Sequence, residues 1–391
     1  MLSAFAIGTT EFVAIGILPN VAADLRISLP AAGWVVSIYA LGVVVGGPIL
    51  TALTGHMPRK WLLVGVMALF TLGNSIVALS PNYEVLLAAR GISAFAHGVF
   101  FGIGANIAAS LVPPERHASA IAMVFSGLTI AVATSVPLGT YLGQALGWRA
   151  TFWAVAGLGL LSVLAMGSLL PGSITTARPG SVGEQVRVLG SGRLLIAFGM
   201  NVFGYGGTFV AFTYLAAILE QVTGFGPQRV SQLLVLYGVS VIAGNAIGGR
   251  LVHRDPVPVL VVMFTLQAVV LIALSFTASS ATGTVVTLAL MGALSFCNVP
   301  GLHLYVLQLA RRYRPGGIDT ASTINISSAN LGIALAALVG GWVVDSPLGL
   351  VATPWVGACV VGIALVLTLW SGWLDRRQGA TATRDELGVQ G

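Results

Sequence analysis

Residues 2–23 read LSAFAIGTTEFVAIGILPNVAA, an apolar stretch that contains one charged side chain, Glu11. An α-helix rises about 1.5 Å per residue, so about 20 apolar residues cross a hydrocarbon layer about 30 Å thick. Further stretches of this kind follow along the 391-residue chain, at roughly 32–54, 61–80, 85–111, 118–146, 150–170, 194–219, 230–250, 257–277, 283–309, 318–344 and 352–373. The sequence therefore predicts twelve membrane-spanning helices.

The composition supports a membrane protein. Hydrophobic residues make up 56% of the chain and charged residues 8%, whereas soluble domains carry about 25% charged residues, so a soluble globular domain is excluded. Backbone groups in lipid must be hydrogen-bonded within each segment, and the alternating polarity of a membrane β-barrel is missing from the sequence. We therefore expect an all-α polytopic membrane protein.

The chain divides near its middle, where a polar stretch rich in Gly, Ser, Thr and Arg interrupts the apolar pattern. We predict an N-terminal six-helix bundle at 1–171, a cytoplasmic linker at 172–193, a C-terminal six-helix bundle at 194–373 and a cytoplasmic tail at 374–391. Shifting the sequence by about 197 places lays Glu11-Phe12 over Thr208-Phe209. Chance matching is the alternative, but two related six-helix halves are typical of transporters.

Basic residues indicate the orientation, because loops rich in Lys and Arg stay in the cytoplasm. Three basic residues fall in the outer connections, Arg26, Arg149 and Arg229, and Arg90 falls within a span. The other basic residues fall on the inner side if the N-terminus is inside: Arg59, Lys60, Arg116, Arg178, Arg187, Arg193, Arg250, Arg254, Arg311, Arg312, Arg314, Arg376, Arg377 and Arg384. We therefore expect both termini in the cytoplasm. We also expect the first span to be a retained helix rather than a signal peptide, with a short polar segment ahead of it in the natural chain.

Short motifs spread along the chain resemble those of a known family. They are Gly8-Thr9-Thr10-Glu11-Phe12, Pro58-Arg59-Lys60, Arg90-Gly91, His97-Gly98, Pro137-Leu138-Gly139-Thr140, Gly147-Trp148-Arg149 and Asn330-Leu331-Gly332. In these motifs the chain resembles the major facilitator superfamily, and within it the twelve-helix drug:proton antiporter branch that includes the bacterial arabinose/sugar-efflux and chloramphenicol-efflux type permeases. The resemblance implies two pseudo-symmetric bundles, alternating access, multidrug resistance and a multi-pass monomer in the bacterial inner membrane.

Three residues are candidates for proton coupling: Glu11, Arg90 and His97. A charged side chain at the bilayer centre costs about 3 kcal/mol, so a charge retained there indicates a function. Glu11 lies near the midplane, where desolvation disfavours the ionised form and lets the carboxyl take up and release protons. Arg90 keeps its proton and can bias that exchange, and His97 lies on the same helical stripe as Arg90. The alternatives are a permanently paired glutamate, an arginine anchored at the outer interface and a packed histidine.

The C-terminal half offers no carboxylate opposite Glu11, but it has polar and aromatic residues at membrane depth. Pockets for amphipathic molecules are apolar with a few placed polar groups. We expect a substrate wall that includes Asn201, Tyr205, Phe209, Tyr214, Asn298 and Asn325. The alternative is that these side chains join neighbouring membrane helices.

A third group of residues is expected to act in gating. It comprises Asp24, Arg59, Lys60 and Arg250 at the membrane rims, and Pro137 and Gly139 in the fifth span. The chain departs from the family pattern nearby, since Gly55 and His56 stand where an acid and an arginine are usual. The alternative for the rim charges is that they only set the topology.

Together these features predict a secondary active transporter that exports a small amphipathic molecule, such as a drug or sugar-like metabolite, by proton-coupled antiport. The alternative is a proton-coupled symporter or facilitative importer, and a passive channel is a further one. We find no His-Glu-x-x-His helix, nucleophile elbow or Walker loop in the sequence, and no metal-ligand spacing, so we expect neither an enzyme nor a metal site. The expected partners are the substrate, protons and the lipid bilayer, with no nucleic acid, and the proton gradient takes the place of a cofactor.

Overall fold

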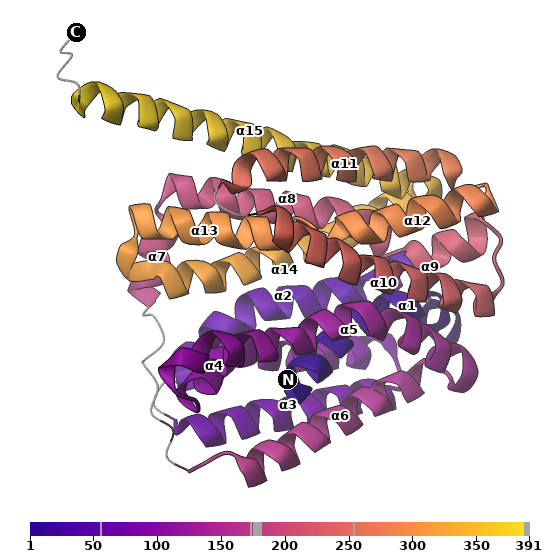
Figure 1. The fold of residues 1–391 in the computed structure, drawn as a ribbon. Helices are drawn as coiled ribbons and strands as arrows, with labels where there is room; N and C mark the ends of the chain where they lie inside the picture. Colours follow the sequence, from indigo (N-terminus) through magenta and orange to yellow (C-terminus); the bar gives the residue numbers. More distant parts are fainter. Residues whose placement is uncertain (55–56, 173, 175–181, 253–254, 387–391) are drawn as a thin grey trace.

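The computed structural model describes residues 1–54, 57–172, 174, 182–252 and 255–386 of the chain, and within these ranges it contains helices and no strands. Twelve helical segments are long and apolar enough to cross a membrane. The prediction of an all-α protein with twelve spans is therefore confirmed. The helices form two bundles, one from each half of the chain, which lie side by side in Figure 1.

The first bundle consists of α1 (Leu2–Leu25), α2 (Leu29–Thr54), α3 (Arg59–Leu79), α4 (Tyr83–Ser110), α5 (His117–Leu146) and α6 (Trp148–Leu169). The short helix α7 (Val182–Leu189) follows in the predicted linker and packs against the second bundle. The second bundle consists of α8 (Gly192–Phe212) with α9 (Leu215–Ala217), α10 (Pro227–Leu251), α11 (Pro256–Thr277), α12 (Ala281–Ser295) with α13 (Val299–Tyr313), α14 (Ile318–Asp345) and α15 (Thr353–Glu386).

Two spans of the second bundle are interrupted, although the sequence predicted continuous helices. The seventh span ends in a π-helical turn at Ile218–Val222. The tenth breaks between Ser295 and Val299, where Pro300 lacks the N–H that would continue the helical hydrogen bonds. α15 also runs past the expected end of its span at residue 373, so the segment from 374 to Glu386, expected as a tail, extends this helix.

The two bundles meet along two helix pairs, α2 with α14 and α5 with α10. Ser37 Oγ on α2 donates a hydrogen bond of 3.1 Å to the carbonyl of Ala334 on α14, and Ser231 Oγ on α10 donates one of 3.0 Å to Oε1 of Gln144 on α5. The connections α4–α5 and α13–α14 lie at one end of the molecule, which we call the linker end. The four hydrogen-bonded residues lie toward the other end, which we call the opposite end.

Gly238 of α10 lies at a close approach between the bundles. A Cβ added there would lie 1.9 Å from the carbonyl oxygen of Ala133 on α5. A backbone oxygen cannot move aside without shifting its helix, so glycine at this position allows the two helices to touch. The two bundles are thus in contact in the half of the molecule that includes the opposite end.

Candidate functional site

A cavity of about 450 Å³ lies between the bundles, on the linker side of these contacts. It is within the range of about 300–1,000 Å³ that is usual for small-molecule pockets. Helices α1, α4 and α5 form one wall, and α8, α10, α13 and α14 form the other. Its lining residues are Glu11, Phe12, His97, Phe101, Ile121, Phe125, Leu128, Thr129, Val132, Asn201, Tyr205, Val241, Asn245, Phe296, Val299, Pro300, Leu302, His303, Asn325, Ile326, Ala329, Asn330 and Ile333.

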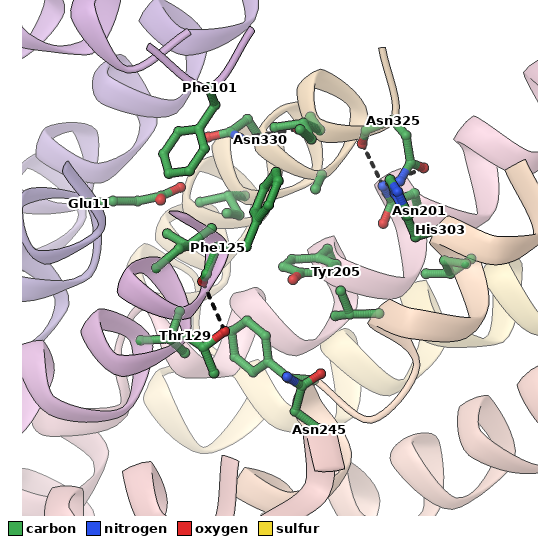
Figure 2. Close-up of a pocket in the computed structure, with 18 of the residues that line it drawn as sticks. Glu11, Phe101, Phe125, Thr129, Asn201, Tyr205, Asn245, His303, Asn325 and Asn330 are labelled. Carbon is green, nitrogen blue, oxygen red and sulfur yellow. Dashed lines mark hydrogen bonds between the residues drawn. The ribbon is translucent and has the colours of Figure 1, made fainter. Parts of the chain in front are cut away.

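Glu11 points into this cavity from α1, as Figure 2 shows. The residue is 7% exposed, and its neighbours Phe12 and Val13 are buried. Its carboxylate faces His97 of α4, with 3.9 Å between Oε2 and Nδ1. Among the described residues that line the cavity, Glu11 is the one carboxylate. The acid is therefore turned away from lipid and toward an internal space.

His97 connects Glu11 to a residue that the sequence did not single out. Its Nδ1 lies 3.1 Å from the hydroxyl of Tyr39 on α2, and its ring centroid lies 5.1 Å from that of Phe101. His97 and Tyr39 are both buried. The imidazole thus has the carboxylate on one side and the phenol on the other. Tyr39 had a weak signal in the sequence, as a hydroxyl inside an apolar run.

Arg90 is wholly buried in the first bundle, at 0% exposure, so it is not an anchor at the outer interface. Nη1 donates to the carbonyl (2.9 Å) and Oγ1 (3.1 Å) of Thr10, and Nε donates to the carbonyl of Val35 (3.1 Å). The guanidinium carbon lies 4.2 Å from the ring centroid of Tyr39. No carboxylate of the described residues lies within 4 Å of it, but Glu11 attracts it from further away. The buried cation therefore holds the peptide next to Glu11 without pairing directly with the acid.

The predicted substrate residues fall into two sets. Asn201, Tyr205 and Asn325 line the cavity. Asn201 Nδ2 also donates to the carbonyl (2.7 Å) and Oδ1 (3.0 Å) of Asn325 and to Ser328 Oγ (3.1 Å), so this pair both lines the cavity and joins α8 to α14. In Figure 2 these bonded amides lie on the wall across from Glu11.

Phe209, Tyr214 and Asn298 do not line the cavity, which corrects the sequence prediction. Phe209 is buried behind it, stacked on Tyr205 with 5.8 Å between ring centroids. Tyr214 donates to the carbonyl of Ala337 (2.9 Å) near the opposite end, and Asn298 donates to Gln267 Oε1 (2.9 Å) inside the second bundle. The sequence indicated only the depth of each residue in the membrane. Depth does not show which side of a helix faces the cavity, so it could not separate the lining residues from the other three.

Two of the predicted gating residues, Asp24 and Lys60, bond within the first bundle. Asp24 accepts bonds from Trp148 Nε1 (2.9 Å) and Arg149 (2.5 Å), and Lys60 Nζ donates to the carbonyl of Leu170 (2.7 Å). Arg59 is buried at the start of α3, and Arg250 is exposed at the end of α10.

The remaining two gating candidates, Pro137 and Gly139, are in α5, where Gly139 packs against Val13 of α1. The contacts that join the bundles involve other residues, namely Ser37, Gln144, Ser231 and Gly238. His56 and Arg254, which the sequence placed at the inner rim, lie outside the described residues.

The structure adds two lining amides that the sequence analysis did not assign to the substrate wall, Asn245 and Asn330. Both were visible as amides in apolar runs, the same signal that indicated Asn201. The facing wall is rich in aromatic and aliphatic side chains, among them Phe12, Phe101 and Phe125. The cavity therefore has one largely apolar wall that holds an acid and one amide-rich wall.

Comparison with known proteins gives the same assignment as the motifs. The profile of the Major Facilitator Superfamily matches residues 1–325. The chain is similar to the uncharacterized MFS-type transporter YtbD of Bacillus subtilis, at 46% identity over 96% of this chain and 95% of the relative. It is also similar to the chloramphenicol resistance protein of Streptomyces lividans, at 33% identity over 93% and 92%.

A solved structure, that of the D-xylose-proton symporter, matches with a TM-score of 0.76 and 14% identity, over 94% of this chain and 95% of that one. This identity is low, so the match supports the fold alone.

Proposed function

Because the chain belongs to the major facilitator superfamily, we propose that it is a secondary active transporter that exports a small amphipathic molecule in exchange for protons. The observation that carries the proposal is Glu11, the one carboxylate among the described lining residues of the cavity between the bundles. The membrane is the bacterial cytoplasmic membrane, with both termini in the cytoplasm, as the distribution of basic residues favours.

Proton coupling requires a group whose two protonation states favour different conformations or different ligands. Glu11 is such a group because of its neighbour Arg90, which stays charged. When Glu11 is ionised, the two buried charges attract each other. When Glu11 is protonated, Arg90 is left as an unbalanced buried charge. Protonation of Glu11 therefore changes the charge of the cavity wall by one unit, so a proton gradient can act on the transporter through Glu11.

The contacts between the bundles fit alternating access. They close the opposite end, through Ser37, Ser231 and Gly238, and the cavity lies on the linker side of them. With the linker in the cytoplasm, this arrangement faces inward and loads substrate from the cytoplasm. Rocking of the two bundles about the cavity then exposes it to the outside, as in other transporters built from related halves.

Export rests on the relatives, since the Streptomyces lividans protein that covers most of the chain is named for chloramphenicol resistance. The second candidate is proton-coupled symport or facilitative import, which the same cavity and acid also allow. Antiport and symport differ in the direction of the proton movement that accompanies the substrate, and facilitative import involves no proton movement.

The test is transport by the full chain in proteoliposomes under an imposed pH gradient. Drugs and sugars of different charge are first screened by thermal stabilisation, and the compound that binds best is used. Antiport predicts that the compound accumulates in the acidic compartment as protons leave it. Symport predicts that the compound leaves the acidic compartment together with the protons. Flux that ignores the gradient would contradict proton coupling.

Glu11→Gln keeps the size of the side chain and removes its titration. We expect this variant to bind and exchange the compound but to lose gradient-driven accumulation. Glu84→Gln is the matched control, because Glu84 is exposed in the first turn of α4. Full coupling in Glu11→Gln would overturn the assignment of the proton site.

A further inference from the structure

We infer that Tyr39 is a positioning residue of the proton site: its hydroxyl and the Glu11 carboxylate compete for the same nitrogen of His97, so His97 switches partner when Glu11 gains or loses its proton. This inference rests on the proposed function of Glu11 and deepens it. Two distances carry it, 3.1 Å from Nδ1 of His97 to the Tyr39 hydroxyl and 3.9 Å from the same Nδ1 to Oε2 of Glu11.

Nδ1 of His97 cannot donate to Glu11 and accept from Tyr39 at the same time. A neutral imidazole has one N–H donor and one acceptor nitrogen. The ionised Glu11 carboxylate only accepts, so it needs a proton on Nδ1. The Tyr39 hydroxyl donates best to an Nδ1 without a proton. With Glu11 ionised, Nδ1–H turns to the carboxylate and the phenol loses its acceptor. With Glu11 protonated, Nδ1 is free to accept from Tyr39.

The distances fit the second arrangement, in which Tyr39 donates to Nδ1. The Tyr39–His97 contact is within hydrogen-bond distance, whereas 3.9 Å between His97 and Glu11 is too long for a hydrogen bond. Tyr39 is 1% exposed and is not among the described residues that line the cavity, so water cannot readily replace the lost partner of its hydroxyl. An unpaired buried hydroxyl is costly, and that cost falls on the state with ionised Glu11. Tyr39 therefore favours the protonated acid.

The other ionisable groups around His97 and Glu11 do not compete for Nδ1. Arg90 of α4 lies on the ring of Tyr39, with 4.2 Å to the centroid, and it donates to Thr10 and Val35. Tyr205 of α8 faces Glu11 across the cavity, and His303 of α13 lines the same cavity from the second bundle. Helices α3 and α5 contribute no ionisable side chain to the described contacts or cavity wall here.

Tyr39 also places the switch on the helix that closes the opposite end. Ser37, two residues earlier on α2, donates to Ala334 of the other bundle (3.1 Å). Residues two apart on a helix point in different directions, so Tyr39 faces the proton site while Ser37 faces α14.

The test uses Tyr39→Phe, which removes the hydroxyl and keeps the ring under Arg90. Infrared difference spectroscopy of the purified full chain follows the C=O band of the protonated carboxyl, identified by its loss in Glu11→Gln. We expect the pH at which Glu11 is half protonated to fall by about one unit, a tenfold loss of proton affinity. An unchanged midpoint would overturn the inference.

Two further variants separate a switch from a general packing effect. Tyr237→Phe is the matched control, because the buried Tyr237 hydroxyl bonds to Ser295 (3.0 Å) away from Glu11, and we expect no shift. In a His97→Gln background, Tyr39→Phe should change the midpoint by less than about 0.3 unit, since the shared nitrogen is gone. The same one-unit shift without His97 would contradict the inference.

If Tyr39→Phe does not fold, the wild-type chain gives the answer. With ring-labelled tyrosine, one tyrosine C–O band should change at the same pH as the carboxyl band, and both changes should vanish in Glu11→Gln. A carboxyl band that titrates without any tyrosine change would overturn the inference. These spectra need neither substrate nor gradient. They can therefore contradict the role of Tyr39 while proton-coupled transport is observed, and they can support that role while coupled transport is absent.

Discussion

Replacing Gly238 with alanine should push the transporter out of the conformation described above. The added Cβ would lie 1.9 Å from the carbonyl oxygen of Ala133, whereas ordinary van der Waals contact begins at 3.4 Å. The helices must therefore separate by about 1.5 Å at this point. Overpacking of this kind costs about 1–3 kcal/mol. Only the state in which α5 and α10 touch bears this cost, so its population relative to the other state falls by about 5- to 150-fold.

The assay is pulsed electron paramagnetic resonance between spin labels at the opposite end, one at Glu84 of the first bundle and one at Gln228 of the second, both exposed. We expect Gly238→Ala to move the distance distribution toward the longer, open population. The control is Gly65→Ala, because no atom lies within 4 Å of a Cβ placed there. A Gly238→Ala distribution identical to that of the control would refute the reasoning.

Three further predictions concern individual side chains. Arg90→Gln removes the buried cation that bonds the Thr10 carbonyl, so we expect loss of proton coupling and a loss of about 1–3 kcal/mol in stability. Transport with unchanged pH dependence would show that the role of Arg90 is structural only. Asn201→Leu removes the donor to Oδ1 of Asn325, while the Asn325 carbonyl keeps its bond from Ser328 Oγ. We therefore expect a similar destabilisation by thermal unfolding and weaker substrate binding, and unchanged binding would argue against that wall. Arg149→Gln breaks a half-exposed pair with Asp24, so we expect a change below about 1 kcal/mol that shrinks in high salt, and a larger, salt-independent change would show a buried role.

The spans could be predicted from the sequence because lipid imposes a simple rule of length and polarity. Glu11 could be identified as a candidate for the same reason, since an acid in an apolar run is costly. The breaks were harder, because the hydrophobicity of 283–309 continues through the interruption before Pro300. An apolar run says how long a segment is, but not where its helix is interrupted.

Side-chain direction was the main limit at the site. Tyr205 and Phe209 lie one turn apart on α8, yet only Tyr205 reaches the cavity, and Phe209 packs behind it. The partner of His97 was also out of reach, because Tyr39 lies 58 residues away in sequence and nothing in its own span indicates the contact. Such pairings depend on helix packing across the bundle, which a single sequence does not contain.

The most direct test of the central claim is to count protons when substrate binds. The purified chain is mixed with a transported compound in weakly buffered solution that contains a pH indicator, near the pH at which Glu11 is half protonated. Antiport through Glu11 predicts proton release by the wild type and none by Glu11→Gln at equal occupancy. Release of the same size from Glu11→Gln, or proton uptake by the wild type, would contradict the account.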